Sequence, residues 1–270
     1  MRRPLYSAVL IALVWAVPAI AQEKPQTKPP QKPSPTLPKP SPQKPKLPRQ
    51  YKWFMAIGGG VQFAPSNLTD EFTFEAHAES GTTSVEYLTK AAPLLDVGIG
   101  RRFWKTGGFA AGVTHSSYTG SVRTESDVPH PFFDDQDRHV SGEAGDIGRS
   151  ETSIHAQLFW VREHRKWRTR VLGGLTFFNV RQDVVTEVDV IETYPYDTAE
   201  FRGVTTESGD GSGLGFNVGA DVAWMYTPQF GLGGAVRYTR GSVDINVSGG
   251  RNVSTDAGGV QAVAGIRFAF

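Results

Sequence analysis

From Tyr51 onward, apolar and polar residues alternate over short segments, and helical periodicity is absent over any useful length. Alternation of this kind is typical of β-strands that present two faces to two different environments. The segments come in pairs, with a very short connection inside each pair and a long polar connection between pairs. Eight of them can be delimited, at about 51–63, 91–103, 108–118, 151–162, 167–180, 215–226, 230–240 and 258–270. The pattern therefore predicts an all-β fold of eight antiparallel strands.

Segment length and connection pattern favour a barrel that spans a membrane. Each segment has roughly the 9–11 residues that a tilted transmembrane strand needs. An even number of strands with alternating short and long connections is typical of outer-membrane barrels. Membrane-spanning helices are excluded, because every apolar run after residue 21 is interrupted within a few residues. Alternation alone does not distinguish the inside of a barrel from its outside, so a soluble exported β-protein remains the alternative.

The tryptophans distinguish these two alternatives. All five that follow residue 50 fall near the ends of segments that carry the short connections: Trp53, Trp104, Trp160, Trp167 and Trp224. Amphipathic aromatic rings gather at the depth of lipid headgroups, whereas a soluble barrel has no reason to collect them at one rim. The five residues are therefore predicted to form an interface aromatic girdle. The fold class expected is an eight-stranded, antiparallel, up-and-down transmembrane β-barrel.

The opposite face of the same segments carries charges that suit a narrow polar lumen. They are Asp96, Arg102, Arg168, Asp221, Arg237 and Arg267. Charges inside an eight-stranded barrel must pair, because an unpaired buried charge costs several kcal/mol. Asp221 and Arg237 are expected to face each other across a turn centred at Gln229. The six residues are predicted to form a lumen charge network.

Residues 1–21 are predicted to be a signal peptide. Two arginines near the start precede an apolar stretch over 8–20, and Ala19 and Ala21 occupy the positions where signal peptidase reads small residues. Cleavage before Gln22 is expected, because the apolar stretch is short for an uncleaved membrane anchor. The chain has no cysteine, so neither a lipid-anchoring cysteine nor a disulfide is expected.

Residues 22–50 differ in composition from everything that follows. They contain ten prolines and seven basic residues against one acidic residue, with hardly an apolar side chain. Such a segment cannot bury a core and is expected to be a disordered, extended, polyproline-like segment in the periplasm. It is either a passive spacer or a binding segment for an anionic periplasmic partner. Residues 51–270 carry a net negative charge, which argues against nucleic-acid binding by this domain.

The last segment ends in alternating apolar residues, among them Ile266, Phe268 and Phe270. It resembles the C-terminal assembly signal of bacterial outer-membrane barrels, which the barrel-assembly machinery recognises. The layout of residues 51–270 is similar to the eight-stranded transmembrane domain of outer membrane protein A and to the opacity-type surface barrels. This resemblance implies that the domain resides in the cell outer membrane and has the lipid bilayer and the assembly machinery as partners.

Function is expected to lie in the long connections near 64–90, 119–150, 186–214 and 241–257, which should be loops facing outside. Asp134, Asp135 and Asp137 lie in one of them, but they lack the glycine and distal glutamate of a calcium loop. They are interpreted as a solvated acidic loop, and no metal or other cofactor is expected.

Catalysis is the least favoured of the functions considered. His115 and Ser117 share a face and loosely resemble the histidine and serine of lipid A deacylases, but neither an orienting acid nor an oxyanion donor can be assigned. His155 is interpreted as a lumen residue. The sequence favours a non-enzymatic outer-membrane barrel of structural or surface-interaction type. A narrow pore for small solutes and a lipid-modifying enzyme remain as alternatives.

Overall fold

The computed structural model describes residues 51–63, 68–247 and 251–270. The predicted signal peptide (1–21) and proline- and lysine-rich segment (22–50) lie outside the described residues. Within the described part of the chain, no helix is long and apolar enough to cross a membrane.

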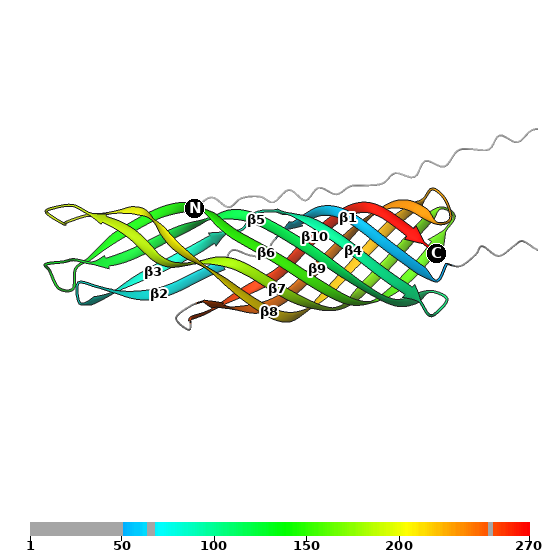
Figure 1. The fold of residues 1–270 in the computed structure, drawn as a ribbon, viewed down its shortest axis with the longest axis horizontal. Coiled ribbons are helices and arrows are strands. Elements are labelled where there is room, and N and C mark those ends of the chain that lie inside the picture. The colour runs from blue at the N-terminus through cyan, green and yellow to red at the C-terminus, as the bar shows by residue number, and fades with distance from the viewer. Residues whose placement is uncertain (1–50, 64–67, 248–250) are drawn as a thin grey trace, which may run out of the picture. The chain divides into compact units, whose positions relative to one another are not determined.

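Ten antiparallel strands make up the described structure (Figure 1). They are β1 (Trp53–Phe63), β2 (Leu68–Ala76), β3 (Glu79–Leu88), β4 (Ala92–Arg102), β5 (Gly107–Pro129), β6 (Asp137–His164), β7 (Trp167–Glu192), β8 (Ala199–Met225), β9 (Phe230–Val247) and β10 (Arg251–Ala269). Eight of these strands pair in a closed ring, in the order β1, β4, β5, β6, β7, β8, β9, β10 and back to β1. The predicted eight-stranded up-and-down barrel is therefore confirmed. Closure matters physically, because it leaves no unpaired strand edge around this ring.

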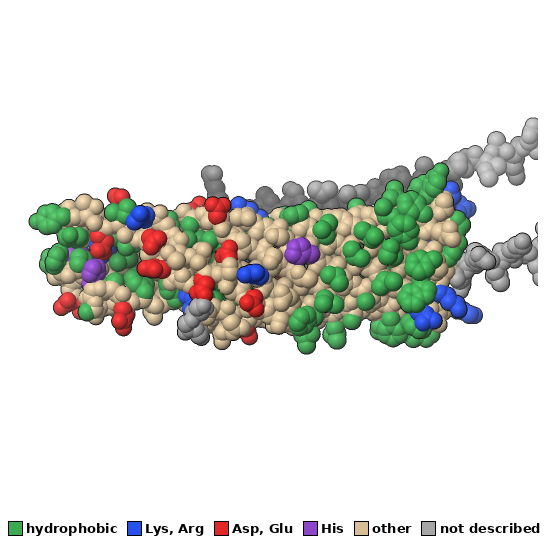
Figure 2. Space-filling view, in the orientation of Figure 1, with side chains coloured by type: hydrophobic (Ala, Val, Ile, Leu, Met, Phe, Trp, Pro, Cys, Tyr) green, Lys and Arg blue, Asp and Glu red, His purple; other side chains and the backbone are tan. Residues whose placement is uncertain are grey.

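One half of the barrel carries an apolar outer surface. Outward side chains here include Leu95, Val113, Ile154, Leu175 and Val236, all of them exposed. Figure 2 shows hydrophobic side chains gathered on the visible face toward the end where Figure 1 places the C-terminus. An outward apolar band of this kind is the surface that a transmembrane barrel presents to lipid. We call this the membrane half: it comprises β1, β4 and the adjoining stretches of the other six ring strands.

The strands do not stop where the apolar band stops. β6 has 28 residues and β8 has 27, well beyond what a bilayer requires. The prediction of long loops over 119–150, 186–214 and 241–257 was therefore wrong, since most of these residues continue the sheet. Apolar and polar residues still alternate here, but the apolar residues face in and the polar residues face out. In the sequence, these outward polar residues resemble a solvated loop. We call this extension the distal half.

The connection between β1 and β4 adds two strands to the distal half. β2 and β3 form a hairpin, and β3 pairs with β5 from Thr82↔Asp127 to Leu88↔Ser121. The pairing of β6 with β7 ends at Arg149↔Gln182. Beyond that point the distal half consists of a four-stranded sheet, in the order β2, β3, β5, β6, and a long β7–β8 hairpin.

The β7–β8 hairpin packs against the inner face of this four-stranded sheet. Val185 of β7 is fully buried against Val85 of β3 and Val122 of β5. The Val185 amide donates a hydrogen bond of 2.8 Å to the Tyr87 hydroxyl of β3. A second apolar cluster joins β7, β9 and β10 just below, and contains Phe178, Val180, Val184, Val243, Ile245, Val247, Val253 and Ala257. The distal half thus has an apolar core of its own.

Candidate functional site

The interior of the membrane half is built in layers of paired charges. In the inner layer on the side of the short turns, Asp221 of β8 accepts hydrogen bonds from Arg170 of β7 and Arg267 of β10, each at 2.7 Å. The Arg170 guanidinium also lies 3.9 Å from the centre of the Phe54 ring. All three charged side chains are buried, so one carboxylate compensates two guanidinium groups that have little access to water.

The next layer pairs Arg237 of β9 with Asp96 of β4 at 2.8 Å. The expectation that Asp221 and Arg237 face each other was wrong, since Asp221 lies opposite Ala235 and Arg237 lies opposite Gly219. The turn between β8 and β9 is centred one residue earlier than expected. Its geometry is fixed by the Thr227 side chain, whose hydroxyl accepts a hydrogen bond of 3.0 Å from the Phe230 amide. A shift of one residue at the centre moves every cross-strand partner by two.

Arg102 and Arg168 do not belong to these inner layers. Both bind Glu163, at 2.8 Å and 3.2 Å, near the end of the barrel that carries the short turns. Glu163 and Arg170 are lumen residues that the predicted network omitted. The register of the β6–β7 hairpin places Glu163 directly opposite Arg168. A turn centred on Arg165 and Lys166 predicts this pairing, so Glu163 could have been included from the sequence.

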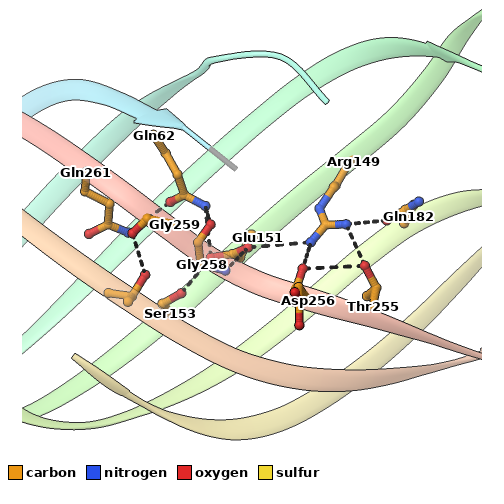
Figure 3. A network of polar contacts seen from close by, with 11 residues as sticks. Gln62, Arg149, Glu151, Ser153, Gln182, Thr255, Asp256, Gly258, Gly259 and Gln261 are labelled. Atoms are coloured by element: carbon orange, nitrogen blue, oxygen red, sulfur yellow. Dashed lines mark hydrogen bonds and ion pairs between the residues drawn. The ribbon is translucent and has the colours of Figure 1, made fainter. Parts of the chain in front are cut away.

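A third polar layer closes the barrel where the two halves meet (Figure 3). Glu151 of β6 accepts hydrogen bonds from the Gln62 amide at 3.1 Å and from the Gly258 backbone amide at 3.1 Å. Gln261 donates to Gln62 at 2.9 Å, and Arg149 lies 3.9 Å from the Glu151 carboxylate. A glycine is required at 258, because its φ of 96° is left-handed and a Cβ there would lie 2.5 Å from the carbonyl oxygen of Thr239. The layer therefore depends on a backbone position that only glycine can occupy without strain.

The histidines considered from the sequence lie on opposite faces of the wall. His155 is buried inside the barrel, with its ring nitrogens 3.1 Å and 2.9 Å from the hydroxyls of Thr114 and Thr176. His115 and Ser117 point outward, and the His115 ring is hydrogen-bonded to the Thr152 hydroxyl at 2.9 Å. The hydroxyl of Thr152 cannot play the part of the carboxylate that would orient a catalytic histidine.

The five tryptophans all lie near the short turns. Each is exposed on the outer surface, and their exposed fractions range from 38% for Trp224 to 62% for Trp160. Basic groups accompany two of them, with Arg101 5.2 Å from the Trp53 ring centre and Lys166 5.8 Å from that of Trp224. Rings beside cationic groups at one level of a barrel fit a lipid headgroup region.

The predicted assembly signal lies at the end of β10, which pairs with both β1 and β9. Ile266 and Phe270 are exposed on the outer surface, and the Phe268 ring lies 5.6 Å from that of Phe230. Ile266 and Phe268 therefore lie on the strand that closes the barrel, and Phe270 follows it directly.

The far end of the distal half combines exposed aromatic rings with a partly buried ion pair. Phe132, Phe133 and Tyr194 are exposed, the last at 82%. Beneath them, Glu192 of β7 is bound by Arg138 of β6 and lies 3.4 Å from His77, in the turn between β2 and β3. This tip clamp, defined as Glu192, Arg138 and His77, ties the β7–β8 hairpin to the four-stranded sheet.

Opposing effects set the pKa of Glu192 in the clamp. Burial raises the pKa of its carboxyl, but the hydrogen bonds and charges of Arg138 and His77 outweigh this and hold it below its ordinary value. The carboxylate is therefore charged at neutral pH. Asp134, Asp135 and Asp137 lie in the neighbouring exposed turn, and among the described residues no group of three His, Asp or Glu side chains is placed to hold a metal ion.

A cavity of about 410 Å³ lies between the β7–β8 hairpin and the sheet, next to the tip clamp. Phe72 and Phe74 of β2, Val128 of β5 and Val188 and Val190 of β7 form its apolar walls. The sequence reading missed this cavity because it treated 64–90 and 186–214 as loops. The alternation over 68–76, which places Leu68, Phe72 and Phe74 on one face, was the available signal.

Comparison with known proteins finds structural likenesses at low sequence identity. No protein-family model matches the sequence, and no curated protein matches it. The structure is similar to that of the outer membrane protein OprG from Pseudomonas aeruginosa, at 11% identity over 82% of this chain and 96% of that one, with a TM-score of 0.43. The outer membrane protease OmpT from Escherichia coli is 10% identical over 81% of this chain and 97% of that one, with a TM-score of 0.45. Ail, the attachment invasion locus protein of Yersinia pestis, is 12% identical over 82% of this chain and 100% of that one, with a TM-score of 0.37. The likeness concerns the fold alone.

Proposed function

We propose that this chain is a non-enzymatic outer-membrane barrel of structural and surface-interaction type. The observation that carries the proposal is the distal half, a packed body with its own apolar core that ends in exposed aromatic rings. Contiguous exposed aromatic side chains are typical of interaction surfaces, because they bury a large area on contact. On this proposal the membrane half is the anchor and the distal half is the part presented outside the cell.

The packing of the interior supports a sealed barrel over a narrow pore. Inward side chains at successive levels have little or no contact with water, among them Asp221, Arg237, Gln261 and Glu151. Above them, Phe178 and Ile245 are fully buried in an apolar core. Conduction needs a continuous water path, and paired charges followed by apolar packing oppose one.

Two further parts of the proposal concern the ends of the chain. Residues 22–50 would lie in the periplasm, as a spacer or as a ligand for an anionic envelope component. Ile266, Phe268 and Phe270 would be read by the barrel-assembly machinery before the barrel closes. A Phe270→Ala variant is expected to lower the amount of folded protein in the outer membrane, measured by heat-modifiable electrophoretic migration. The control is Phe132→Ala, which changes an aromatic ring far from β10.

Conductance tests the sealed barrel. The refolded protein inserted into planar lipid bilayers is expected to give no steady single-channel currents. Reproducible current steps that scale with the number of inserted molecules would establish the pore instead.

Site-selective labelling in intact cells tests the orientation, and the chain is suited to it because it has no cysteine. Asp135→Cys lies in the distal turn between β5 and β6, and Lys105→Cys lies in the short turn between β4 and β5. A membrane-impermeant maleimide is expected to label the first in intact cells and the second only after the outer membrane is opened. The reverse pattern would overturn the proposed presentation of the distal half.

A further inference from the structure

The cavity of the distal half combines apolar and polar side chains. Its apolar walls stand beside the hydroxyls of Ser126 and Thr186, and Glu75 of β2 and Glu187 of β7 are exposed at its rim. A volume of about 410 Å³ lies within the range of small-molecule sites, which are largely apolar and hold a few placed polar groups.

The charges around the cavity are unevenly compensated. Glu192 is bound by Arg138 and His77, and Asp70, behind Phe72, lies 3.5 Å from Arg251. Glu75 and Glu187 form no ion pair with any described residue, and none of the residues lining the cavity is lysine or arginine. The rim therefore carries two uncompensated negative charges.

Uncompensated carboxylates beside apolar walls define the chemistry of a complementary ligand. An anionic ligand would be repelled by Glu75 and Glu187, and a small hydrated cation would gain nothing from the apolar walls. An organic cation with an aromatic or aliphatic body satisfies both, since its body leaves water for the walls while its charge stays near the carboxylates. The Phe74 ring can add a cation–π attraction, whereas the Phe72 ring already has the Arg251 guanidinium 4.7 Å from its centre and offers the ligand apolar contact.

We propose that this cavity, between β2, β5 and β7, binds a small organic cation with an apolar body. Access is provided at β2, which is the edge strand of its sheet and pairs with β3 alone among the described strands. The tip clamp closes the other end, because Glu192 joins the hairpin to the β2–β3 turn at the border of the cavity. The inference deepens the proposed surface role and rests on it only in placing the cavity outside the cell.

Binding can be measured on the full protein refolded into bilayer discs of zwitterionic lipid. The probe is benzyltrimethylammonium, and phenylacetate and neopentylbenzene serve as its anionic and neutral counterparts, with affinity measured by equilibrium dialysis against empty discs. The cation is expected to bind saturably and to bind more weakly at high salt. The neutral probe is expected to bind more weakly than the cation, and the anion not at all.

Variants distinguish binding of the cation in the cavity from its nonspecific attraction to the negatively charged surface of the protein. The double variant Glu75→Gln/Glu187→Gln is expected to weaken binding of the cation by about tenfold, which corresponds to about 1.4 kcal/mol. The matched control Glu125→Gln/Glu200→Gln removes two exposed carboxylates that do not line the cavity, and it is expected to leave the affinity unchanged. Val128→Trp, which fills the cavity, is expected to abolish binding of both the cation and the neutral probe.

Three results would overturn the inference: no saturable binding, equal affinity for phenylacetate, or equal weakening by the two double variants. Because Val128→Trp changes packing, its folding is checked by heat-modifiable migration. If that variant fails to fold, the comparison of the two Glu→Gln double variants still tests whether the cation binds in the cavity. Failure here is distinguishable from failure of the proposed function. The conductance and labelling results do not depend on the cavity, and binding in discs does not depend on which way the barrel faces.

Discussion

The two halves of this barrel share the six strands β5 to β10, and yet the apolar face of these strands points outward in one half and inward in the other. Along β7, Val171 and Leu175 point outward in the membrane half, whereas Val180 and Val184 point inward in the distal half. From Val171 to Val184 the direction of the side chains alternates regularly, and only the chemistry of each face changes; the register with β8 first shifts beyond this stretch, between Val185 and Glu187. The comparison shows that the medium outside the wall decides which face of a strand is apolar.

The forces that hold the halves together differ accordingly. Lipid is as apolar as the outward side chains, so burial against it contributes little, and the membrane half depends on backbone pairing and internal ion pairs. The distal half faces water, so its core is held by the hydrophobic effect. The Gln62–Glu151–Gly258 layer lies at the boundary between the membrane half and the water-facing distal half.

Breaking the inner charge layer is expected to have the largest effect. Asp221→Ala leaves Arg170 and Arg267 without their shared carboxylate, and removing one partner from a buried ion pair costs about 3–5 kcal/mol. The measurement is the free energy of unfolding in urea for protein folded into lipid vesicles. Asp210→Ala removes an exposed carboxylate from the same strand and is expected to change that free energy little. Equal effects of the two variants would mean that the membrane half does not depend on its ion pairs.

A matched pair of isoleucines tests the inversion directly. Ile245→Ala empties a fully buried position in the distal core and is expected to cost about 2–5 kcal/mol of the free energy of unfolding. Ile154→Ala removes the same atoms from the outward face of the membrane half, where lipid chains can fill the space. Its effect is expected to be clearly smaller in the same assay. If Ile154→Ala were the more damaging variant, the assignment of the two faces would have to be reversed.

Breaking the hydrogen bond between Tyr87 of the sheet and Val185 of the hairpin is expected to give an intermediate effect. Burial raises the pKa of Tyr87 to about 12, so its side chain remains a neutral phenol. Tyr87→Phe leaves the buried Val185 amide without its acceptor, a loss of about 1–3 kcal/mol. Hydrogen exchange should show lower protection in β3 and in β7 near Val185, with no change in the membrane half. Tyr194→Phe, at an exposed position, serves as the control, and unchanged protection near Val185 would contradict the assigned hydrogen bond.

Acidification is expected to have the smallest and most local effect. Because the pKa of Glu192 is lowered in the folded protein, its contribution to stability is fully present above the ordinary glutamate pKa of about 4.3 and is lost as the pH falls below that value. Protection of the β7–β8 tip against hydrogen exchange, corrected for intrinsic rates, should therefore fall between pH 6 and pH 3. Glu192→Gln should show low tip protection at both pH values. A wild-type tip that stays equally protected at pH 3 would show that the charged Glu192 carboxylate does not stabilise the tip.

The ring of eight strands could be predicted because alternation, strand length and the short turns are local properties of the sequence. The strands of the distal half were not predicted because their outward residues are polar. Polar residues at every second position resemble a solvated loop unless the apolar residues between them are recognised as an inward face. The doublet Phe177-Phe178 marks the change along β7, since Phe177 faces out from the membrane half and Phe178 faces into the distal core. Two adjacent apolar residues in an alternating strand were the signal that the medium outside the wall had changed.

The sequence by itself determined the all-β class, the strand count of the ring, and the faces on which Trp53, Asp96 and Arg237 lie. The tertiary structure alone decided the partners: Asp221 binds Arg170 and Arg267 rather than Arg237, and Glu163 gathers Arg102 and Arg168. It also decided that 68–88 forms a hairpin on β5 and that a cavity lies beneath β7. The physical reason is that periodicity fixes the direction of a side chain, whereas contacts across a barrel depend on register and closure, and a shift of one residue in a turn changes them all.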